Sequence, residues 1–217
     1  MKLIQAQFVT SAVDARGIPG DGVPHVALVG RSNVGKSSLI NALTRRALAR
    51  TSAAPGKTRL ANLYRVDVDG GPGGRGRWSV YLADLPGYGY ARGGRESIAE
   101  LRKIAEEYFD AGRTFRSGDE AGLKTRPANI RIALVLHLVD ARHPELEADL
   151  EAAHWLGTLG IERTSVATKV DKLSRSERAK NLKALERQLG TAALPISAAT
   201  GEGLDDLWTL IARLSRQ

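Results

Sequence analysis

The stretch VALVGRSNVGKSSLIN, residues 26–41, constrains the fold of this chain more than any other. It carries the pattern G-x-x-x-x-G-K-[ST] as Gly30, Gly35, Lys36 and Ser37, after a short apolar run and before a helix-like run. A glycine-bearing loop between a strand and a helix turns backbone N–H groups inward and forms a nest for phosphate oxygens. The lysine can reach the β- and γ-phosphates, and the hydroxyl after it can ligand Mg²⁺. The stretch therefore predicts a phosphate-binding loop in an α/β domain.

We expect the whole loop to contact nucleotide, because backbone N–H groups rather than one side chain form the nest. A glycine-bearing turn with an ordinary surface lysine would not explain the flanking strand and helix. The expected nucleotide contacts in this loop are Gly30, Arg31, Ser32, Asn33, Val34, Gly35, Lys36, Ser37 and Ser38.

Apolar periodicity predicts that strands alternate with helices along the rest of the chain. The expected strands are residues 26–29, 60–68, 78–83, 132–139, 164–168 and 194–197. The expected helices are residues 37–47, 96–109, 145–159, 174–189 and 204–214. Ser174 and Glu177 open the fourth helix as a capping box, and a glycine-rich connection makes the second and third strands an antiparallel hairpin. We expect a three-layer α/β domain whose six-stranded, mostly parallel sheet has one antiparallel strand and about five helices.

The length of 217 residues suits one such domain, residues 25–217, with an N-terminal extension, residues 1–24, packed on it. Cysteine is absent, which excludes disulfides and thiolate metal sites. The N-terminus lacks the apolar stretch of a signal peptide, and the longest apolar run, residues 132–139, is too short to span a bilayer. We therefore expect a soluble, cytoplasmic, monomeric protein without a membrane span.

The net charge of +8 is unevenly distributed. Residues 45–131 hold 17 basic and 10 acidic side chains, whereas residues 1–44 hold 4 and 2 and residues 132–217 hold 11 and 12. Nearly all of the excess therefore lies in the segment after the phosphate loop and its helix. This clustering favours an anionic partner such as nucleic acid.

A second element, WSVYLADLPG at residues 78–87, is a strand that ends in a carboxylate and continues as Leu-Pro-Gly. The carboxylate would lie beside the phosphate loop and hold the Mg²⁺ shell through water, and the glycine N–H would sense a γ-phosphate. The pattern D-x-x-G is common by chance, so its position at a strand end is what gives it weight. The expected nucleotide contacts here are Asp84, Leu85, Pro86 and Gly87.

Two further loops follow the last two strands and favour guanine. The carboxylate of Asp171 can accept hydrogen bonds from the ring N–H and the exocyclic amine of guanine, a donor pair that adenine lacks. The stem of Lys169 can lie along the base, and the N–H of Ala198 can bond O6. All four elements come in order at the sheet edge where nucleotides bind. The expected contacts in these loops are Thr168, Lys169, Val170, Asp171, Ile196, Ser197 and Ala198.

These elements resemble those of translation-factor-related GTPases, and most closely those of the EngB (YihA or YsxC) family of bacterial ribosome-assembly GTPases. The matching phrases cover nearly the whole chain: GRSNVGKSSLIN (30–41), PGKT (55–58), DLPGYGYA (84–91), VDARH (139–143), TKVDKLSRSE (168–177) and GEGLDDLW (201–208). The resemblance implies GTP binding and hydrolysis to GDP with Mg²⁺. It also implies association with the large ribosomal subunit and its RNA during assembly, and a need in cell division and septation.

The resemblance also implies roles for individual residues. Thr58 looks like the switch threonine that ligands Mg²⁺ only when the γ-phosphate is bound, and its segment adds Pro55, Gly56, Lys57 and Thr58 to the nucleotide contacts. The implied magnesium ligands are Ser37, Thr58 and, through water, Asp84. The residues expected to act in catalysis are Lys36, Thr58, Gly87 and Asn33.

The chain departs from the commoner GTPase pattern at two positions. Thr168 stands where many GTPases carry an asparagine, so that bridging amide is absent, and we expect modest nucleotide affinity. Tyr88 stands where a water-orienting glutamine often follows D-x-x-G, so we expect slow intrinsic hydrolysis unless the tyrosine simply packs outward. Asn33 stands where potassium-stimulated relatives carry an asparagine, which makes K⁺ a candidate second cation. Arg31, or a ribosomal element, is the rival source of positive charge.

Other residues and functions stay open at this point. His137 and the tryptophans Trp155 and Trp208 are expected in the core, and Trp78 either faces RNA or packs against the hairpin. A nucleotide-gated protein-binding switch in cell division, without direct ribosome binding, is the alternative function. An ATPase of the same fold is a third, which Asp171 disfavours.

Overall fold

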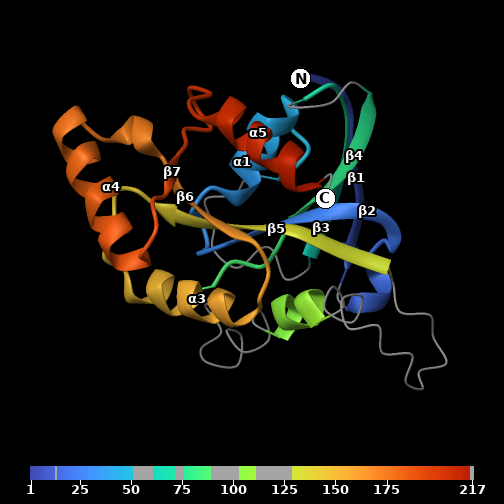
Figure 1. Ribbon diagram of the computed structural model, residues 1–217, viewed down its shortest axis with the longest axis horizontal. Coiled ribbons are helices and arrows are strands. Elements are labelled where there is room, and N and C mark those ends of the chain that lie inside the picture. Colours follow the sequence, from blue (N-terminus) through green and yellow to red (C-terminus); the bar gives the residue numbers. More distant parts are fainter. Residues whose placement is uncertain (13, 51–60, 72–75, 89–102, 111–128, 216–217) are drawn as a thin grey trace.

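The computed structural model describes residues 1–12, 14–50, 61–71, 76–88, 103–110 and 129–215. These residues build one seven-stranded sheet in the order β1-β3-β4-β2-β5-β6-β7 (Figure 1). The strands are β1 (Lys2–Ala12), β2 (Asp21–Gly30), β3 (Ala61–Asp69), β4 (Arg77–Asp84), β5 (Asn129–Asp140), β6 (Arg163–Thr168) and β7 (Leu194–Pro195). Strand β3 is antiparallel to both of its neighbours, and the remaining pairs are parallel. The expected mostly parallel sheet with one antiparallel strand is confirmed.

Helices cover both faces of the sheet (Figure 1). They are α1 (Lys36–Thr44), α3 (Glu147–Thr158), α4 (Arg175–Leu189) and α5 (Leu204–Ser215), together with the helical segment 103–110. One apolar cluster joins α1 and α5 to one face, and a second joins α3 and segment 103–110 to the other. A third, smaller cluster packs α4 on β5 and β6. The three-layer architecture that alternating strands and helices predict is therefore present.

The sheet has seven strands, not six, because the N-terminal segment adds β1 at its edge. The sequence signal of β1 is weak, since only Ala6 and Ala12 of its side chains are fully buried. Two shifts of register against β3, at Leu3/Gln5 and Phe8/Thr10, also break the strict alternation that identifies a strand. The division into an extension of residues 1–24 and a domain of residues 25–217 stays a prediction.

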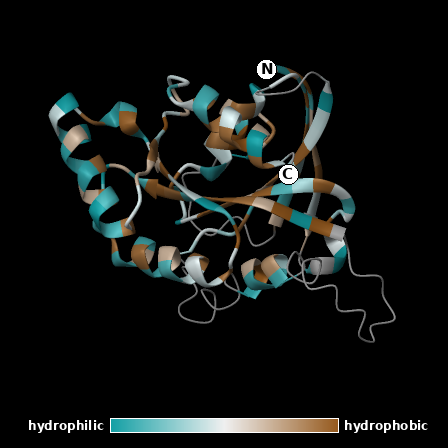
Figure 2. Cartoon of the chain, in the orientation of Figure 1, coloured by the Kyte–Doolittle hydropathy of each residue, from teal (hydrophilic) through white to brown (hydrophobic). Residues whose placement is uncertain are grey.

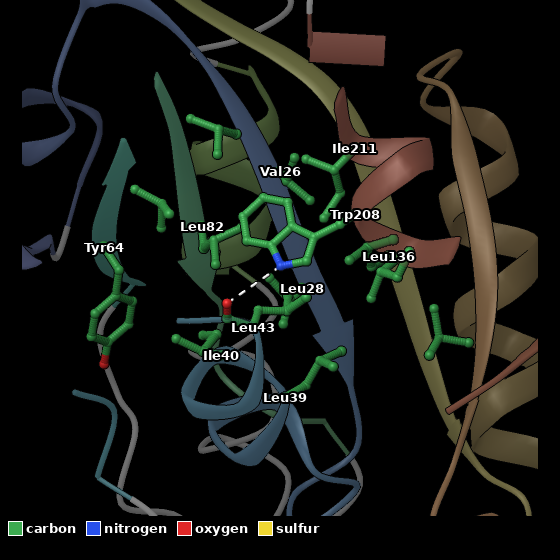
Figure 3. Packing of buried hydrophobic residues seen from close by; sticks show 14 of the residues in the cluster. Val26, Leu28, Leu39, Ile40, Leu43, Tyr64, Leu82, Leu136, Trp208 and Ile211 are labelled. Carbon is green, nitrogen blue, oxygen red and sulfur yellow. Dashed lines mark hydrogen bonds between the residues drawn. The ribbon is translucent and has the colours of Figure 1, made fainter. Parts of the chain in front are cut away.

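The core on the α1 and α5 side is organised around Trp208 (Figure 3). Its indole N–H donates to the carbonyl of Leu43 at 3.3 Å, which ties α5 to the end of α1. The indole N–H of Trp78 donates to the carbonyl of Gly70 in the hairpin at 2.9 Å, which agrees with the hairpin-packing interpretation. The ring of Trp78 also meets Trp208 edge-on at 6.4 Å between centroids. In Figure 2 the central strands are largely hydrophobic while the helices carry both hydrophobic and hydrophilic residues, as amphipathic surface helices do.

Local signals that depend on neighbouring residues alone are reproduced closely. Ser174 accepts from the backbone N–H of Glu177, and the Glu177 side chain accepts from the N–H of Ser174, so the predicted capping box opens α4. The helix ends at Gly190, whose φ of 69° suits glycine. Because β2, β4, β5, β6 and β7 are parallel, their carboxyl ends lie on the same side of the sheet. The loops that carry the predicted site residues follow these carboxyl ends.

Candidate functional site

The phosphate loop lies between β2 and α1, as its sequence predicts. Gly35 caps the helix with a φ of 117°, and Asn33 also has a left-handed backbone, with a φ of 63°. The ammonium of Lys36 donates to the carbonyls of Gly30, at 2.9 Å, and Arg31, at 3.1 Å, and is almost fully buried. Burial lowers the pKa of Lys36, and the nearby Asp84 carboxylate opposes that shift. The loop thus encloses a cation at the start of a helix, which is the arrangement that binds phosphate.

The carboxylate at the end of β4 faces this loop. The hydroxyl of Ser37 donates to Asp84 Oδ2 at 2.8 Å, and Asp84 is only 2% exposed. Among the described residues, Asp84 Oδ1 has no hydrogen-bond partner. Burial raises the pKa of Asp84, against the opposing charge of Lys36 and the hydrogen bond from Ser37. A hydroxyl and a buried carboxylate oxygen without a partner are the hard oxygen donors that Mg²⁺ prefers, so the residues present fit this metal.

The D-x-x-G loop rests directly on the phosphate loop. A Cβ atom at Gly87 would lie 2.7 Å from the backbone nitrogen of Ser32 and 2.8 Å from Lys36 Nζ, so a larger residue does not fit. The N–H of Ser32 donates to the carbonyl of Tyr88 at 3.1 Å, and Arg31 and Tyr88 form an isolated parallel bridge. Gly87 therefore lies beside the lysine that would meet a β- or γ-phosphate.

The side chain of Tyr88 does not point outward. Its hydroxyl donates to Asp149 Oδ1 of α3 at 2.9 Å and lies 3.0 Å from Nε2 of His137 on β5. The guanidinium of Arg31 contacts both oxygens of Asp149 at 3.2 Å. The charge of Arg31 is thus already paired, which disfavours the suggestion that it stabilises charge at the β–γ bridge.

The loops after β6 and β7 meet at Asp171. The buried Ser197 donates its hydroxyl to Asp171 Oδ1 at 2.7 Å, and Lys172 Nζ lies 3.3 Å from the other carboxylate oxygen. The hydrogen bond from Ser197 is the main cause that lowers the pKa of Asp171, so the group is a carboxylate at neutral pH. An oriented carboxylate can accept the two donors on the edge of guanine.

Thr168 changes one expectation from the sequence. Its hydroxyl donates to the carbonyl of Val34 in the phosphate loop at 2.8 Å and lies 3.1 Å from the carbonyl of Val139. The link from β6 to the phosphate loop that an asparagine would make is therefore present, made by a shorter side chain. The modest nucleotide affinity expected from the absent amide stays a prediction.

Lys169 adds a second link to the same loop. Its ammonium donates to the carbonyl of Asn33 at 2.7 Å and to Asp140 Oδ2 at 2.9 Å. Asp140 also accepts a bidentate pair of hydrogen bonds from Arg142. These bonds outweigh burial and lower the pKa of Asp140. The base-side loop and the phosphate loop are therefore held as one unit.

The sequence motifs did not identify every residue of this site. His137, Asp140 and Asp149 make contacts as close as those of the predicted residues. For His137 and Asp140 the only sequence signal was a polar residue in or just after an apolar run, and Asp149, in the charged first turn of a helix, had none. The predicted switch segment, Pro55, Gly56, Lys57 and Thr58, lies outside the described residues.

The fold and the site define a P-loop GTPase, with a phosphate loop, a D-x-x-G loop and a guanine-type Thr-Lys-x-Asp loop at one sheet edge. A family model described as "50S ribosome-binding GTPase" matches residues 25–169. Proteins named "Probable GTP-binding protein EngB" from Heliobacterium modesticaldum and Pelotomaculum thermopropionicum are 40% and 41% identical. The matches cover 97% and 98% of this chain, and 92% and 96% of those proteins. The chain belongs to the EngB family of GTP-binding proteins and is a GTPase of that type.

Solved structures agree on the fold. A crystal structure of "a probable GTP-binding protein engB" matches 88% of this chain and 98% of its own, with a TM-score of 0.61 at 22% identity. Era in complex with MgGDPNP and a segment of 16S ribosomal RNA also has a TM-score of 0.61, at 23% identity, and matches 88% of this chain and 56% of its own. No helix in the described part of the chain is long and apolar enough to cross a membrane.

Proposed function

We propose that this protein is a GTP-gated factor that binds the large ribosomal subunit during its assembly and is needed for normal cell division and septation. The observation that carries the gating is the close approach of Gly87 to Lys36, so close that a Cβ atom on Gly87 would lie 2.8 Å from Lys36 Nζ; a γ-phosphate would meet both loops there. A loop held at that point can adopt one arrangement with GTP and another with GDP. The protein would act as a monomer in the cytoplasm.

Magnesium would be held by Ser37, by Asp84 through water and by Thr58, which lies outside the described residues. The metal would neutralise charge on the β- and γ-phosphates when bound. Lys36 would neutralise the same oxygens from the protein side, and Gly87 would donate its N–H to the γ-phosphate. The remaining residues of the phosphate loop would enclose the phosphates with backbone N–H groups.

Ribosomal RNA is the proposed partner because of charge. The segment 45–131 carries 17 basic and 10 acidic residues, and each phosphate neutralised on binding releases a counterion. The family model that matches this chain carries the description "50S ribosome-binding GTPase". Era, a protein of the same fold, has been crystallised with a segment of 16S ribosomal RNA. A protein-binding switch in cell division remains the alternative, and charge disfavours it.

Salt dependence separates the two functions. Co-sedimentation with purified large subunits should weaken steeply as salt rises, and reversing the charges of Arg92 and Arg95, which lie outside the described residues, should weaken it while GTP affinity is unchanged. Subunit binding that stays flat between low and high salt would favour the protein-binding alternative.

Potassium is proposed as a second cation near Asn33. Asn33 is an exposed residue of the phosphate loop with a left-handed backbone, and its carbonyl accepts a hydrogen bond from Lys169. GTPase rates in KCl and NaCl at equal ionic strength test this for the wild type and Asn33→Ala. Stimulation by K⁺ that is lost in the variant supports it, and equal wild-type rates in both salts exclude it.

A further inference from the structure

Four side chains from four different segments are linked by hydrogen bonds around Tyr88, the residue directly after the D-x-x-G motif. They are Arg31 of the phosphate loop, Tyr88, His137 of β5 and Asp149 in the first turn of α3. The side chain of Asp149 is only 4% exposed and that of Arg31 is 24% exposed. None of the motifs accounts for this cluster, although two of its members belong to the two loops that would surround a γ-phosphate.

The hydrogen bonds in the cluster have one consistent arrangement of protons. Because the guanidinium of Arg31 donates to both carboxylate oxygens of Asp149, we take Asp149 as ionised and as an acceptor only, although burial raises the pKa of its carboxyl. The single proton of the Tyr88 hydroxyl then goes to Asp149, so the hydroxyl must accept from His137 Nε2. This leaves His137 Nδ1 without a proton, and Nδ1 has no partner among the described residues. Burial lowers the pKa of His137 to about 4, which agrees with a neutral ring.

The cluster fixes the chain immediately after Gly87. The carbonyl of Tyr88 accepts from Ser32, and its side chain is held at the far end by Asp149 and His137. Both ends of Tyr88 are thus fixed, and the preceding Gly87 lies so close to Ser32 and Lys36 that a Cβ atom there would come within 2.7 Å of Ser32 N and 2.8 Å of Lys36 Nζ. A donor fixed before its ligand arrives binds it with less loss of conformational entropy.

We propose that Tyr88 and Asp149 are positioning residues that hold the N–H of Gly87 ready for the γ-phosphate and so strengthen the binding of GTP more than that of GDP. The glutamine that many GTPases carry at this position faces the reacting water. Here the tyrosine instead holds the loop through the contacts of its hydroxyl with Asp149 and His137. The inference rests on the proposed assignment of Lys36 and Gly87 to the γ-phosphate.

The test is a pair of affinities measured for each variant, for GDP and for a non-hydrolysable GTP analogue. Tyr88→Phe keeps the ring and loses the anchoring hydroxyl, and Asp149→Asn keeps the shape and loses the charge. Each should weaken binding of the GTP analogue roughly five- to twentyfold and change GDP affinity by less than about twofold. Tyr81→Phe is the matched control, because its hydroxyl also contacts an aspartate, Asp21 at 3.1 Å, which lies at the end of β2 opposite the phosphate loop.

Three outcomes would overturn the inference. Equal losses for both nucleotides would make the cluster a merely structural support, and unchanged or improved binding of the GTP analogue would remove its role altogether. A Lys36→Ala variant distinguishes failure of the inference about Tyr88 and Asp149 from failure of the γ-phosphate assignment itself. If Lys36→Ala binds the GTP analogue like the wild type, the γ-phosphate assignment fails and the inference with it. If Lys36→Ala loses the analogue while Tyr88→Phe keeps it, only the inference fails.

Discussion

Replacing Thr168 with valine removes one hydroxyl from the link between β6 and the phosphate loop and keeps the shape of the side chain. The hydroxyl has a single proton, and the 2.8 Å distance to the Val34 carbonyl is shorter than the 3.1 Å to Val139, so Val34 is the main acceptor. Val34 is 2% exposed, so water cannot easily replace the lost donor. Leaving a buried carbonyl unsatisfied costs about 1–3 kcal/mol, and we expect the free energy of unfolding to fall by that amount.

Nucleotide affinity should fall as well, because Val34 lies inside the loop that encloses the phosphates. If about 1 kcal/mol of this loss appears in the binding free energy of GDP, the GDP affinity drops roughly fivefold. Urea denaturation gives the stability and a fluorescent GDP titration gives the affinity, with Thr164→Val, on the same strand but farther from the loop, as the control. A Thr168→Val protein with wild-type stability and wild-type GDP affinity would refute the claim that this hydroxyl braces the phosphate loop.

Three further predictions concern the guanine-reading carboxylate, the phosphate and metal site, and the buried histidines. Asp171→Asn should move base preference from guanine towards xanthine nucleotides, and equal competition by ATP and GTP in the wild type would contradict the guanine assignment. Lys36→Ala and Ser37→Ala should abolish tight GTP binding without unfolding the domain, as circular dichroism and a nucleotide titration would report. Burial lowers the pKa of His25 and His137 from 6.5 to about 4, so the unfolded chain binds protons first as pH falls. Stability should therefore be full above pH 6.5 and decrease from there towards pH 4, by roughly 1–2 kcal/mol for each histidine at pH 5; an unfolding midpoint equal at pH 7 and pH 5 would contradict this.

Most of the fold could be predicted because its signals are local. The phosphate loop, the hairpin of β3 and β4 and the capping box at Ser174 each depend on residues a few positions apart. Strand β1 was missed because it is an edge strand with few buried side chains, and its pairing with β3, near residue 65, is remote in the sequence.

The site was predictable only as far as its motifs extend. Which atom Thr168 would donate to depends on the approach of β6 to the phosphate loop, 134 positions away in the chain. The contact of Tyr88 with Asp149 likewise joins residues 61 positions apart, and nothing near either residue specifies the partner. Sequence showed that a glutamine was absent, and the tertiary structure was needed to show what the tyrosine contacts instead.

The most direct test of the proposed function is the binding of the purified protein to purified large ribosomal subunits at one fixed, moderate salt concentration. The amount that pellets with the subunits is measured with a non-hydrolysable GTP analogue, with GDP and without nucleotide, for the wild type and for Lys36→Ala. GTP-gated assembly predicts strong co-pelleting with the GTP analogue, weak co-pelleting with GDP, and no response to nucleotide in the variant. Equal binding of the wild type in all three conditions, or none in any, would contradict it.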